Sequence, residues 1–198
     1  MIETVLTSER ILETAEDVLR RFGPAKTTVV DVARTLGVSH GSVYRHFPSK
    51  AALRDAVAER WLARIAEPLD AMAREDGPAP EKLRRWLELL IAAKRSRARE
   101  DPELFATYVQ LVAESRDVVV AHVNTLTGQL AAIVALGVGR GEFADVDPAM
   151  AGRAVFDATA RFHNPVHAAE WSDPGIDEAF EGVWALVIAA LRPRTRAH

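Results

Sequence analysis

The stretch TTVVDVARTLGVSHGSVYRHFPSK, residues 27–50, is the part of this chain that indicates its fold most clearly. It contains two short helical patterns joined by LGVS at 36–39, and the second pattern ends in YRHF at 44–47. No acidic residue occurs from Val32 to Arg54, whereas arginine, lysine and histidine recur there. A short helix with small residues at one end and cations at the other suits a DNA major groove and its flanking phosphates.

Local signals divide this stretch into helices. Thr28 followed by Asp31 fits a capping box at a helix start. Gly37 permits a sharp turn that a side chain would resist. Ser39 is placed to cap a second helix that ends near Phe47. The pattern therefore predicts helix, tight turn and helix.

Helical patterns also fill the rest of the chain, and no convincing strand is visible. One amphipathic helix precedes Gly23, and a long one is expected over 49–73. Asp-Pro pairs at 101–102, 147–148 and 173–174 each combine an N-cap acceptor with proline at the first helical position. Helices are therefore predicted to begin at 102, 148 and 174, with others over 81–99 and 116–136 and the last ending at Leu191. The expected fold class is all-α.

Composition bounds the possible functions. The chain has 198 residues, 48% hydrophobic and 27% charged, with a formal net charge of −3, so attraction to DNA must be local. It has no cysteine, which excludes disulfides and thiolate metal sites. The N-terminus lacks a signal-peptide pattern, and the apolar run at 130–139 is too short to cross a bilayer, so a cytoplasmic location is expected.

The run G-V-S-x-G-x-V-Y-x-H-F-x-S-K at 37–50 closely resembles the DNA-binding domain of the TetR family of transcriptional regulators. The resemblance extends over about residues 8–55. It implies an N-terminal three-helix helix-turn-helix domain at 1–50 and a larger C-terminal helical domain at 51–198 for effector binding and dimerisation. The helix 49–73 would tie the two together and act as the lever between them.

The resemblance also implies which residues contact DNA. Tyr44, His46 and Lys50 correspond to phosphate-contacting positions, and Arg45 could bond guanine bidentately. Each has an alternative: Tyr44 as a half-buried core residue, His46 as a cap of its own helix, and Arg45 in a surface ion pair. Val30 departs from the family, because some members carry a polar or basic residue there. The full predicted DNA-binding set is Thr28, Ser39, His40, Gly41, Ser42, Tyr44, Arg45, His46 and Lys50.

In such a family the larger domain forms a homodimer. Residues 148–163 and 174–191 are expected to supply the dimer bundle, because both carry apolar stripes with small residues and the second includes Trp184. Burial of these stripes within one subunit is the alternative.

An effector pocket is expected among the middle helices, walled by aromatic residues and oriented by a few polar groups. The candidate walls are Trp86, Phe105, Tyr108, Val112, Phe156 and Phe162. The candidate polar groups are His122, Asn124, Asp157, Arg161 and His163. His163 and His167 are four apart, but Pro165 interrupts the helix that would present both to one metal, so no metal site is predicted. The basic run at 94–99 is interpreted as a solvated helix end, and the terminal residues 194–198 as a frayed tail.

Taken together, these features predict a homodimeric DNA-binding regulator, a repressor released from a pseudo-palindromic operator by a largely hydrophobic small effector. The alternatives are a TetR-like activator or a regulator without a ligand. An enzyme is disfavoured, because no nucleophile–base pair, phosphate loop or HExxH motif occurs, and no cofactor is expected. A protein-interaction scaffold would leave the acid-free stretch unexplained.

Overall fold

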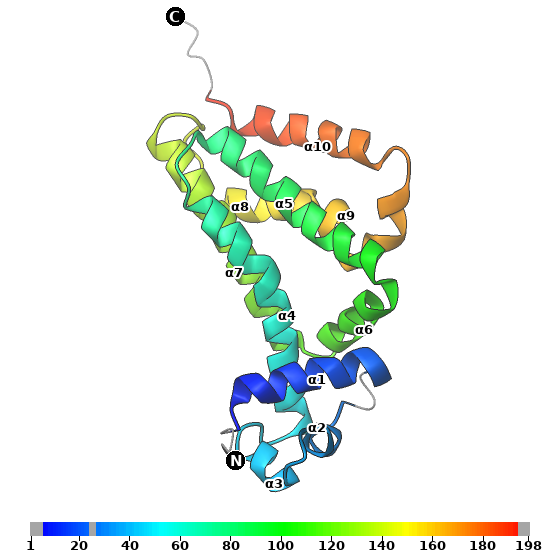
Figure 1. Ribbon diagram of the computed structural model, residues 1–198. Helices are drawn as coiled ribbons and strands as arrows, with labels where there is room; N and C mark the ends of the chain where they lie inside the picture. Colours follow the sequence, from blue (N-terminus) through cyan, green and yellow to red (C-terminus); the bar gives the residue numbers. More distant parts are fainter. Residues whose placement is uncertain (1–5, 24–26, 194–198) are drawn as a thin grey trace, which may run out of the picture. The chain divides into compact units, whose positions relative to one another are not determined.

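The computed structural model describes residues 6–23 and 27–193, and every regular element within these ranges is a helix (Figure 1). The all-α prediction is therefore confirmed, while the predicted frayed tail at 194–198 lies outside the described residues. The helices form two compact units. The first holds the described residues up to Ala63 together with Asp101–Ala121, and the second holds Arg64–Glu100 and the described residues from His122 onward. Helices α4 (Lys50–Ala73) and α7 (Arg116–Gly139) each contribute residues to both units.

The first unit contains α1 (Ser8–Phe22), α2 (Val29–Leu36), α3 (His40–Tyr44), the start of α4, and α6 (Pro102–Ala113). Helix α2 packs against both α1 and α3, and α6 packs against α1. The apolar faces meet in a small core whose fully buried members include Ile11, Ala15, Leu19, Val32, Val43, Leu53 and Val57. The helical spacing of these residues in the sequence is what brings them to one side of each helix.

Helix α6 joins the first unit through aromatic packing. The ring of Trp61, on α4, stacks on Tyr108 with centroids 4.8 Å apart and an interplanar angle of 5°, and lies 6.4 Å from the ring of Phe105. Just beyond α6, the Ser115 hydroxyl donates a 2.6 Å hydrogen bond to Asp55. The compact units consequently divide α4 after Ala63, beyond the functional boundary that the sequence suggests near residue 50.

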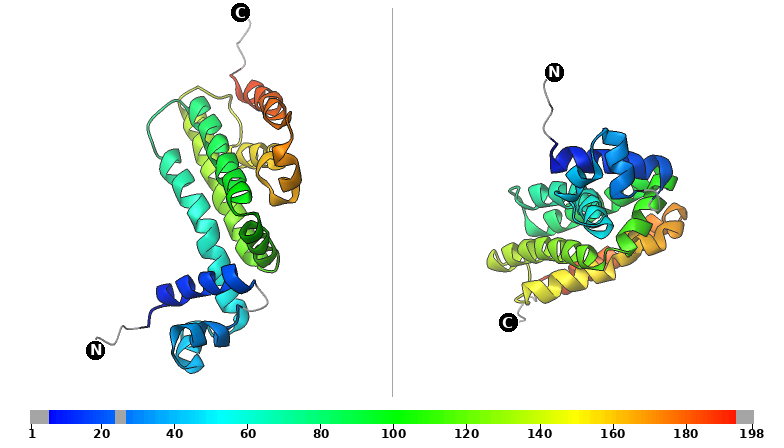
Figure 2. Two further views of the ribbon diagram at one scale, coloured as in Figure 1. Left: turned by 45° about the vertical axis from the view of Figure 1, so that its right-hand side comes forward. Right: turned by 90° about the horizontal axis from the view of Figure 1, so that it is seen from below.

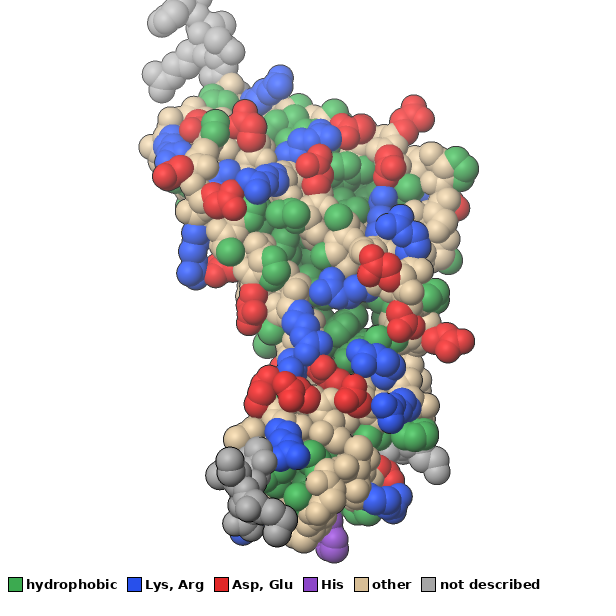
Figure 3. Space-filling model, viewed as in Figure 1, with side chains coloured by type: hydrophobic (Ala, Val, Ile, Leu, Met, Phe, Trp, Pro, Cys, Tyr) green, Lys and Arg blue, Asp and Glu red, His purple; other side chains and the backbone are tan. Residues whose placement is uncertain are grey.

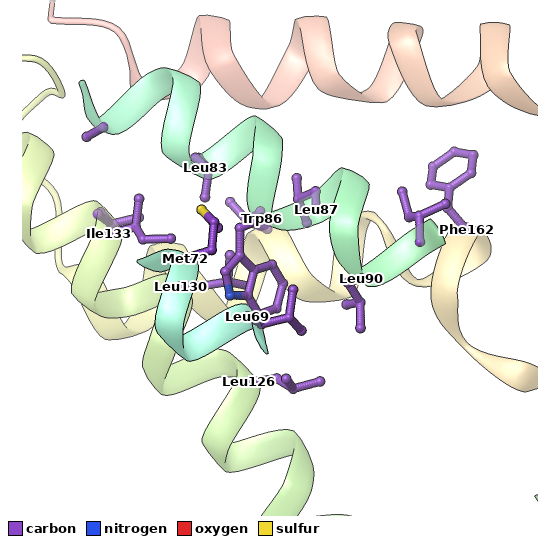
Figure 4. Close-up of a cluster of buried hydrophobic side chains, with 14 of the residues drawn as sticks. Leu69, Met72, Leu83, Trp86, Leu87, Leu90, Leu126, Leu130, Ile133 and Phe162 are labelled. Atoms are coloured by element: carbon purple, nitrogen blue, oxygen red, sulfur yellow. The ribbon is translucent and has the colours of Figure 1, made fainter. Parts of the chain in front are cut away.

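The second unit contains the rest of α4 and α7 with five further helical segments. These are α5 (Ala79–Glu100), α8 (Pro148–Ala158), α9 (Ala160–His163), the 3₁₀ helix η2 (Pro165–Ser172) and α10 (Ile176–Leu191). Helix α5 runs alongside α7 and packs against α9 and η2 (Figure 2). Figure 4 shows the core that these helices enclose, with buried side chains that include Leu69, Met72, Leu83, Trp86, Leu87, Leu90, Leu126, Leu130, Ile133 and Phe162.

Two of the three helix starts predicted from Asp-Pro pairs are confirmed. Asp101 and Asp147 cap α6 and α8 through carboxylate oxygens that accept hydrogen bonds of 3.0 and 2.7 Å from backbone amides. The third prediction is wrong, because Asp173 ends η2 and accepts a backbone bond from Ile176, where α10 begins. Gly175 precedes α10 without a side-chain cap.

The segment 148–163, which is expected to supply part of the dimer bundle, is not one continuous helix. The helix is interrupted at Thr159, whose φ and ψ of −97° and 5° leave the helical region and whose hydroxyl donates a 2.9 Å bond to the Val155 carbonyl. Likewise, α3 ends at Tyr44, before the Phe47 that the sequence suggests.

Helix α7 is more apolar than the run at 130–139 indicates. Among the described residues it is the one helix that is long and apolar enough to cross a membrane. Its most apolar window has a mean hydropathy of 1.6. Its Leu126, Leu130 and Ile133 are buried in the core of the second unit.

Candidate functional site

The turn between α2 and α3 holds α3 in a fixed direction. Gly37 ends α2 in the left-handed region, with φ 68° and ψ 27°, and the Val38 amide donates a 3.1 Å bond back to Ala33. The Ser39 hydroxyl then caps α3 by accepting a 3.1 Å bond from the Ser42 amide. The predicted cap and the predicted glycine turn are therefore both present. Together they form a helix-turn-helix.

One face of α3 is buried and the other carries polar side chains. Val43 is fully buried, whereas Tyr44 is 42% exposed, which is unlike a core tyrosine. The Tyr44 ring meets His40 edge-on, with centroids 6.4 Å apart. Arg45 donates a 3.3 Å bond to the Ser42 hydroxyl and is otherwise exposed. This face presents a phenol, an imidazole and a guanidinium to solvent, all groups that bond phosphates or base edges.

Residues on either side of α3 extend this polar face. His46 is exposed, with Nδ1 3.0 Å from the Ser8 hydroxyl on α1, and Lys50 is exposed at the first position of α4. Thr28 caps α2 by accepting a 3.2 Å bond from the Asp31 amide and donates a 2.5 Å bond to the Asp31 carboxylate. The His46–Ser8 contact joins residues 38 positions apart, so no local pattern in the sequence indicates it.

We define the recognition surface as the nine predicted DNA-binding residues, which lie between the start of α2 and the start of α4. All nine are exposed or half-buried, and none is among the buried core residues. Figure 3 shows an exposed histidine side chain where Figure 1 has α3. Val30, the departure from the family pattern, is 46% exposed beside this surface.

The predicted aromatic walls of an effector pocket fall into separate units. Phe105 and Tyr108 belong to the first unit, packed on Trp61. Trp86 and Phe162 belong to the core of the second unit. The Trp86 indole donates a 3.0 Å bond to Gln129, and Phe162 meets Phe180 edge-on at 5.3 Å.

The predicted polar groups also differ in environment. Asn124 and Asp157 are exposed, and Asp157 accepts a 2.8 Å ion-pair bond from Arg153. His163 is buried, with Nε2 3.2 Å from the Phe156 carbonyl oxygen. Burial lowers the pKa of His163 to about 4, because it disfavours the charged imidazolium.

His163 and His167 engage different partners, as the interrupting proline suggests. His167 lies in η2, where Nδ1 is 2.8 Å from Glu170. No group of three His, Cys, Asp or Glu side chains able to hold a metal occurs among the described residues.

The basic run at 94–99 differs in part from the solvated helix end that the sequence suggests. Lys94 is 6% exposed, so its interpretation as part of a solvated helix end was wrong. Burial, followed by the Arg97 cation, lowers the pKa of Lys94 to about 8. Arg95 pairs with Asp177 at 2.6 Å, and Arg97 donates a 2.8 Å bond to a backbone carbonyl. The signal for burial was available, since Lys94 lies one turn after Leu90 on the same apolar stripe.

Helices α8 and α10 each divide their apolar residues between an inner and an outer face. Gly152 is used inside the subunit, because a Cβ there would lie 2.7 Å from the backbone nitrogen of Ala131. Phe180 is buried in the core, and Trp184 is half-buried, with the Arg84 guanidinium 5.7 Å from its ring centroid. Leu186, in contrast, is 74% exposed on α10.

Comparison with known proteins matches both parts of the chain to one group of proteins. Residues 11–57 match the family described as "Bacterial regulatory proteins, tetR family". Residues 79–184, more than half of the chain, match "Tetracyclin repressor-like, C-terminal domain".

Two curated relatives are similar over about a third of this chain. The transcriptional regulator TtgR of Pseudomonas putida is 40% identical over 70 residues, which cover 32% of this chain and 33% of TtgR. The probable transcriptional regulator ArpR of Pseudomonas putida is 39% identical over 72 residues, covering 33% and 34%. The chain thus matches only about a third of the length of these relatives.

A solved structure is similar over nearly the whole chain. SmeT, the repressor of the Stenotrophomonas maltophilia multidrug efflux pump SmeDEF, aligns with a TM-score of 0.67 over 98% of this chain and 96% of SmeT. Sequence identity is 20%, so this likeness concerns the fold.

Proposed function

Because this chain belongs to the TetR family of bacterial transcriptional regulators, we propose that it is a homodimeric repressor that leaves its operator when a small effector binds. Regulators of this family bind operator DNA and dimerise. The observation that carries the proposal is the recognition surface: α3 is anchored by buried Val43 and presents Tyr44, His40 and Arg45 to solvent. Within this proposal the protein acts in the cytoplasm, where operator DNA is found.

Within this proposal, the residues of the recognition surface contact different parts of the DNA. Tyr44, His46 and Lys50 bond phosphates and set the position of α3, while His40 and Arg45 read base edges. Thr28 already caps α2, and the free amides of that helix start favour a nearby phosphate. Two copies of the surface, related by two-fold symmetry, would read half-sites about one helical turn apart.

The dimer is proposed to form through the outer faces of α8 and α10. Exposed apolar residues on these two helices support this proposal. Met150 is 70% exposed on α8 and Leu186 is 74% exposed on α10. Large exposed apolar patches are a common mark of an interface.

Effector control is proposed as a population shift between operator-binding and released states. Helices α4 and α7 are continuous from one compact unit into the other, so they are the proposed carriers of the change. A complex of SmeT with triclosan has the same fold, with a TM-score of 0.65 at 19% identity, and supports a ligand-binding role for this architecture. An activator, or a regulator that needs no ligand, is the alternative.

The test begins by selecting bound sequences from random duplex DNA and then compares variants at several salt concentrations. Arg45→Ala should relax base preference at one position per half-site, at a cost of roughly 1–3 kcal/mol. Lys50→Ala should weaken binding to all sequences and make the salt dependence shallower by about one unit of slope. Tyr44→Phe should weaken binding to all sequences.

Arg99→Ala is the matched control, because Arg99 is an exposed cation on α5, outside the recognition surface. It should bind as the wild type does. The assignment of the recognition surface is wrong if the selection enriches no DNA sequence. It is also wrong if Arg45→Ala, Lys50→Ala and Tyr44→Phe bind DNA as the control does.

A further inference from the structure

A groove that is open to solvent lies between α4 and α7 in the second unit, and the DNA-binding role does not use it. Its volume is about 590 Å³, within the range of about 300–1,000 Å³ that is typical of small-molecule sites. We refer to it as the α4–α7 groove. It is lined by none of the residues that the sequence suggests for an effector pocket. The lining residues are Ala66, Glu67, Asp70, Ala73 and Arg74 on α4, with Thr125, Gly128, Gln129 and Ala132 on α7.

Small side chains keep the α4–α7 groove hollow. Leu126 of α7 is buried in the core (Figure 4), so Gly128, two positions further on, lies on the opposite face of that helix. A Cβ at Gly128 would meet no atom within 4 Å, so open space borders this position. On the α4 side, Ala66 and Ala73 line the groove with methyl groups. The floor of the groove is therefore largely apolar.

Gln129 joins the two helices at the groove. It is 8% exposed, and its Nε2 atom donates a 3.1 Å hydrogen bond to the Ala66 carbonyl on α4. Its Oε1 atom accepts a 3.0 Å bond from the Trp86 indole, which can only donate, and this fixes the orientation of the amide. Because a buried hydrogen bond holds α4 and α7 together here, the shape of the groove does not depend on a ligand.

The charges along the α4–α7 groove favour a cation. Glu67, Asp70 and Arg74 are spaced three and four positions apart, so they lie on one face of α4. Two carboxylates and one guanidinium leave one excess negative charge among the lining residues. Asp70 is held by Arg74 through a 2.7 Å ion pair, whereas Glu67 is exposed. The Glu67 carboxylate is therefore placed to pair with a positive group beside the apolar floor.

The groove also lies on the two helices that are best placed to transmit binding. Helices α4 and α7 each contribute residues to both compact units, and the first unit contains the helix-turn-helix. Pro68 lies in α4 between Glu67 and Asp70, and a proline inside a helix removes one backbone hydrogen bond and favours bending there. A ligand that changes the bend of α4 or its separation from α7 would alter helices that continue into the first unit.

We propose that the α4–α7 groove binds the effector, and that the effector is an organic monocation with an apolar body. The proposal rests on the proposed effector control and specifies both the site and the chemical class of the ligand. The positive group pairs with Glu67, and the apolar body lies along Ala66, Ala73 and Gly128. An anionic ligand would instead meet the repulsion of the excess negative charge and binds more weakly.

Three probes that share one naphthalene ring system test the charge preference on the whole chain. They are 1-naphthylmethylamine, which is protonated near neutral pH, 1-naphthalenemethanol and 1-naphthaleneacetate. Binding is measured by calorimetry in the absence of DNA. The ammonium should bind about threefold or more tightly than the alcohol, as expected of an exposed ion pair, and the carboxylate should bind most weakly. Added salt should reduce this preference, because it screens exposed charges.

Two glutamate variants of α4 separate the groove from the overall charge of the helix. Glu67→Gln should remove most of the preference for the ammonium over the alcohol, with helical content unchanged by circular dichroism. Glu59→Gln is the matched control, because Glu59 is an exposed glutamate of the same helix that does not line the groove. It should keep the preference.

Two glycine variants of α7 test the groove itself. Gly128→Leu places a side chain in the open space and should abolish detectable binding of the ammonium and the alcohol alike. Gly139→Leu is the matched control, because Gly139 also has open space around it but does not line the groove. It should bind the probes as the wild type does. Light scattering on Gly128→Leu should show an unchanged oligomeric state, since a loss of dimers would assign the groove to a second subunit and overturn the proposal.

Release of operator DNA gives a separate readout. The ammonium probe should weaken operator binding by the wild type and by Gly139→Leu, but not by Gly128→Leu. The proposal is overturned if the ammonium does not bind, binds no better than the alcohol, keeps its preference in Glu67→Gln, or binds without weakening operator binding. Operator binding without a probe, measured on the same samples, distinguishes these failures from failure of the proposed regulatory function.

Discussion

At the scale of single residues, Gly37 has the most direct influence on the direction of α3. Its φ of 68° lies in the left-handed region, which side chains disfavour. A Cβ at this position would meet no atom within 4 Å, so the obstacle to a side chain is the backbone conformation itself. Gly128, inside α7, also has open space around it but no positive φ.

This contrast predicts opposite effects for two glycine-to-alanine substitutions. Gly37→Ala should lower the free energy of unfolding by roughly 1–2 kcal/mol, the cost of a left-handed conformation. Gly128→Ala should raise it by about 0.5–1 kcal/mol, because alanine favours the helix interior. Chemical denaturation followed by circular dichroism measures both. Equal stability of the two variants would contradict the assigned turn.

The half-buried His122 and the buried His163 predict an acid-sensitive fold. In the folded chain their pKa values are about 4, against 6.5 for free histidine, because burial disfavours the charged form. The unfolded chain therefore binds more protons between pH 6.5 and 4, and stability should fall as pH falls through this window. The loss approaches about 3 kcal/mol for each histidine.

Unfolding free energies measured across this pH range test the effect. His163→Gln removes one of the two titrating groups and should make the pH dependence shallower between pH 6.5 and 4. Coincident slopes for the variant and the wild type would exclude His163 as a source of the acid sensitivity.

At the scale of elements, α10 illustrates how one helix serves two surfaces. Its Ile176 and Phe180 are buried in the core, while Leu186 is 74% exposed. Trp184 lies between these extremes and packs under Arg84. An apolar stripe in the sequence identifies α10 as amphipathic, but it does not reveal which apolar residues remain for a partner.

Leu186 is therefore the position that best tests the proposed dimer. Leu186→Glu would place a charge in a desolvated interface, so we expect monomers by light scattering and weaker operator binding, with helical content unchanged. Leu89→Glu, at a 38% exposed leucine on α5, is the control and should remain dimeric. A Leu186→Glu protein that remains a tight dimer would place the interface elsewhere.

At the scale of the whole molecule, the sequence predicts local features better than long-range ones. The Ser39 cap, the Gly37 turn and the Asp101 cap depend on neighbours within a few residues, and all are present. The break at Thr159 was missed, because the apolar periodicity continues through it.

Long-range packing explains the other differences. The sequence suggests Phe105 and Tyr108 as walls of a pocket, but only the folded chain reveals Trp61 as their packing partner. Similarly, the charge of Lys94 suggests solvent, whereas its register on α5 places it beside the core. The candidate DNA-binding residues lie within one continuous stretch, so their grouping could be predicted. The effector candidates come from distant segments, and their grouping could not.

The inclusion of Asp101–Ala121 in the first compact unit has a consequence for the order in which the chain is made. A ribosome that has released only the first 63 residues has not yet supplied Tyr108, so the indole of Trp61 has no ring to stack on. Because bacterial translation adds on the order of 10 residues per second, several seconds separate synthesis of the two rings. The first compact unit therefore completes the aromatic packing of α4 against α6 only after all of α5, a helix of the other unit, has been synthesised.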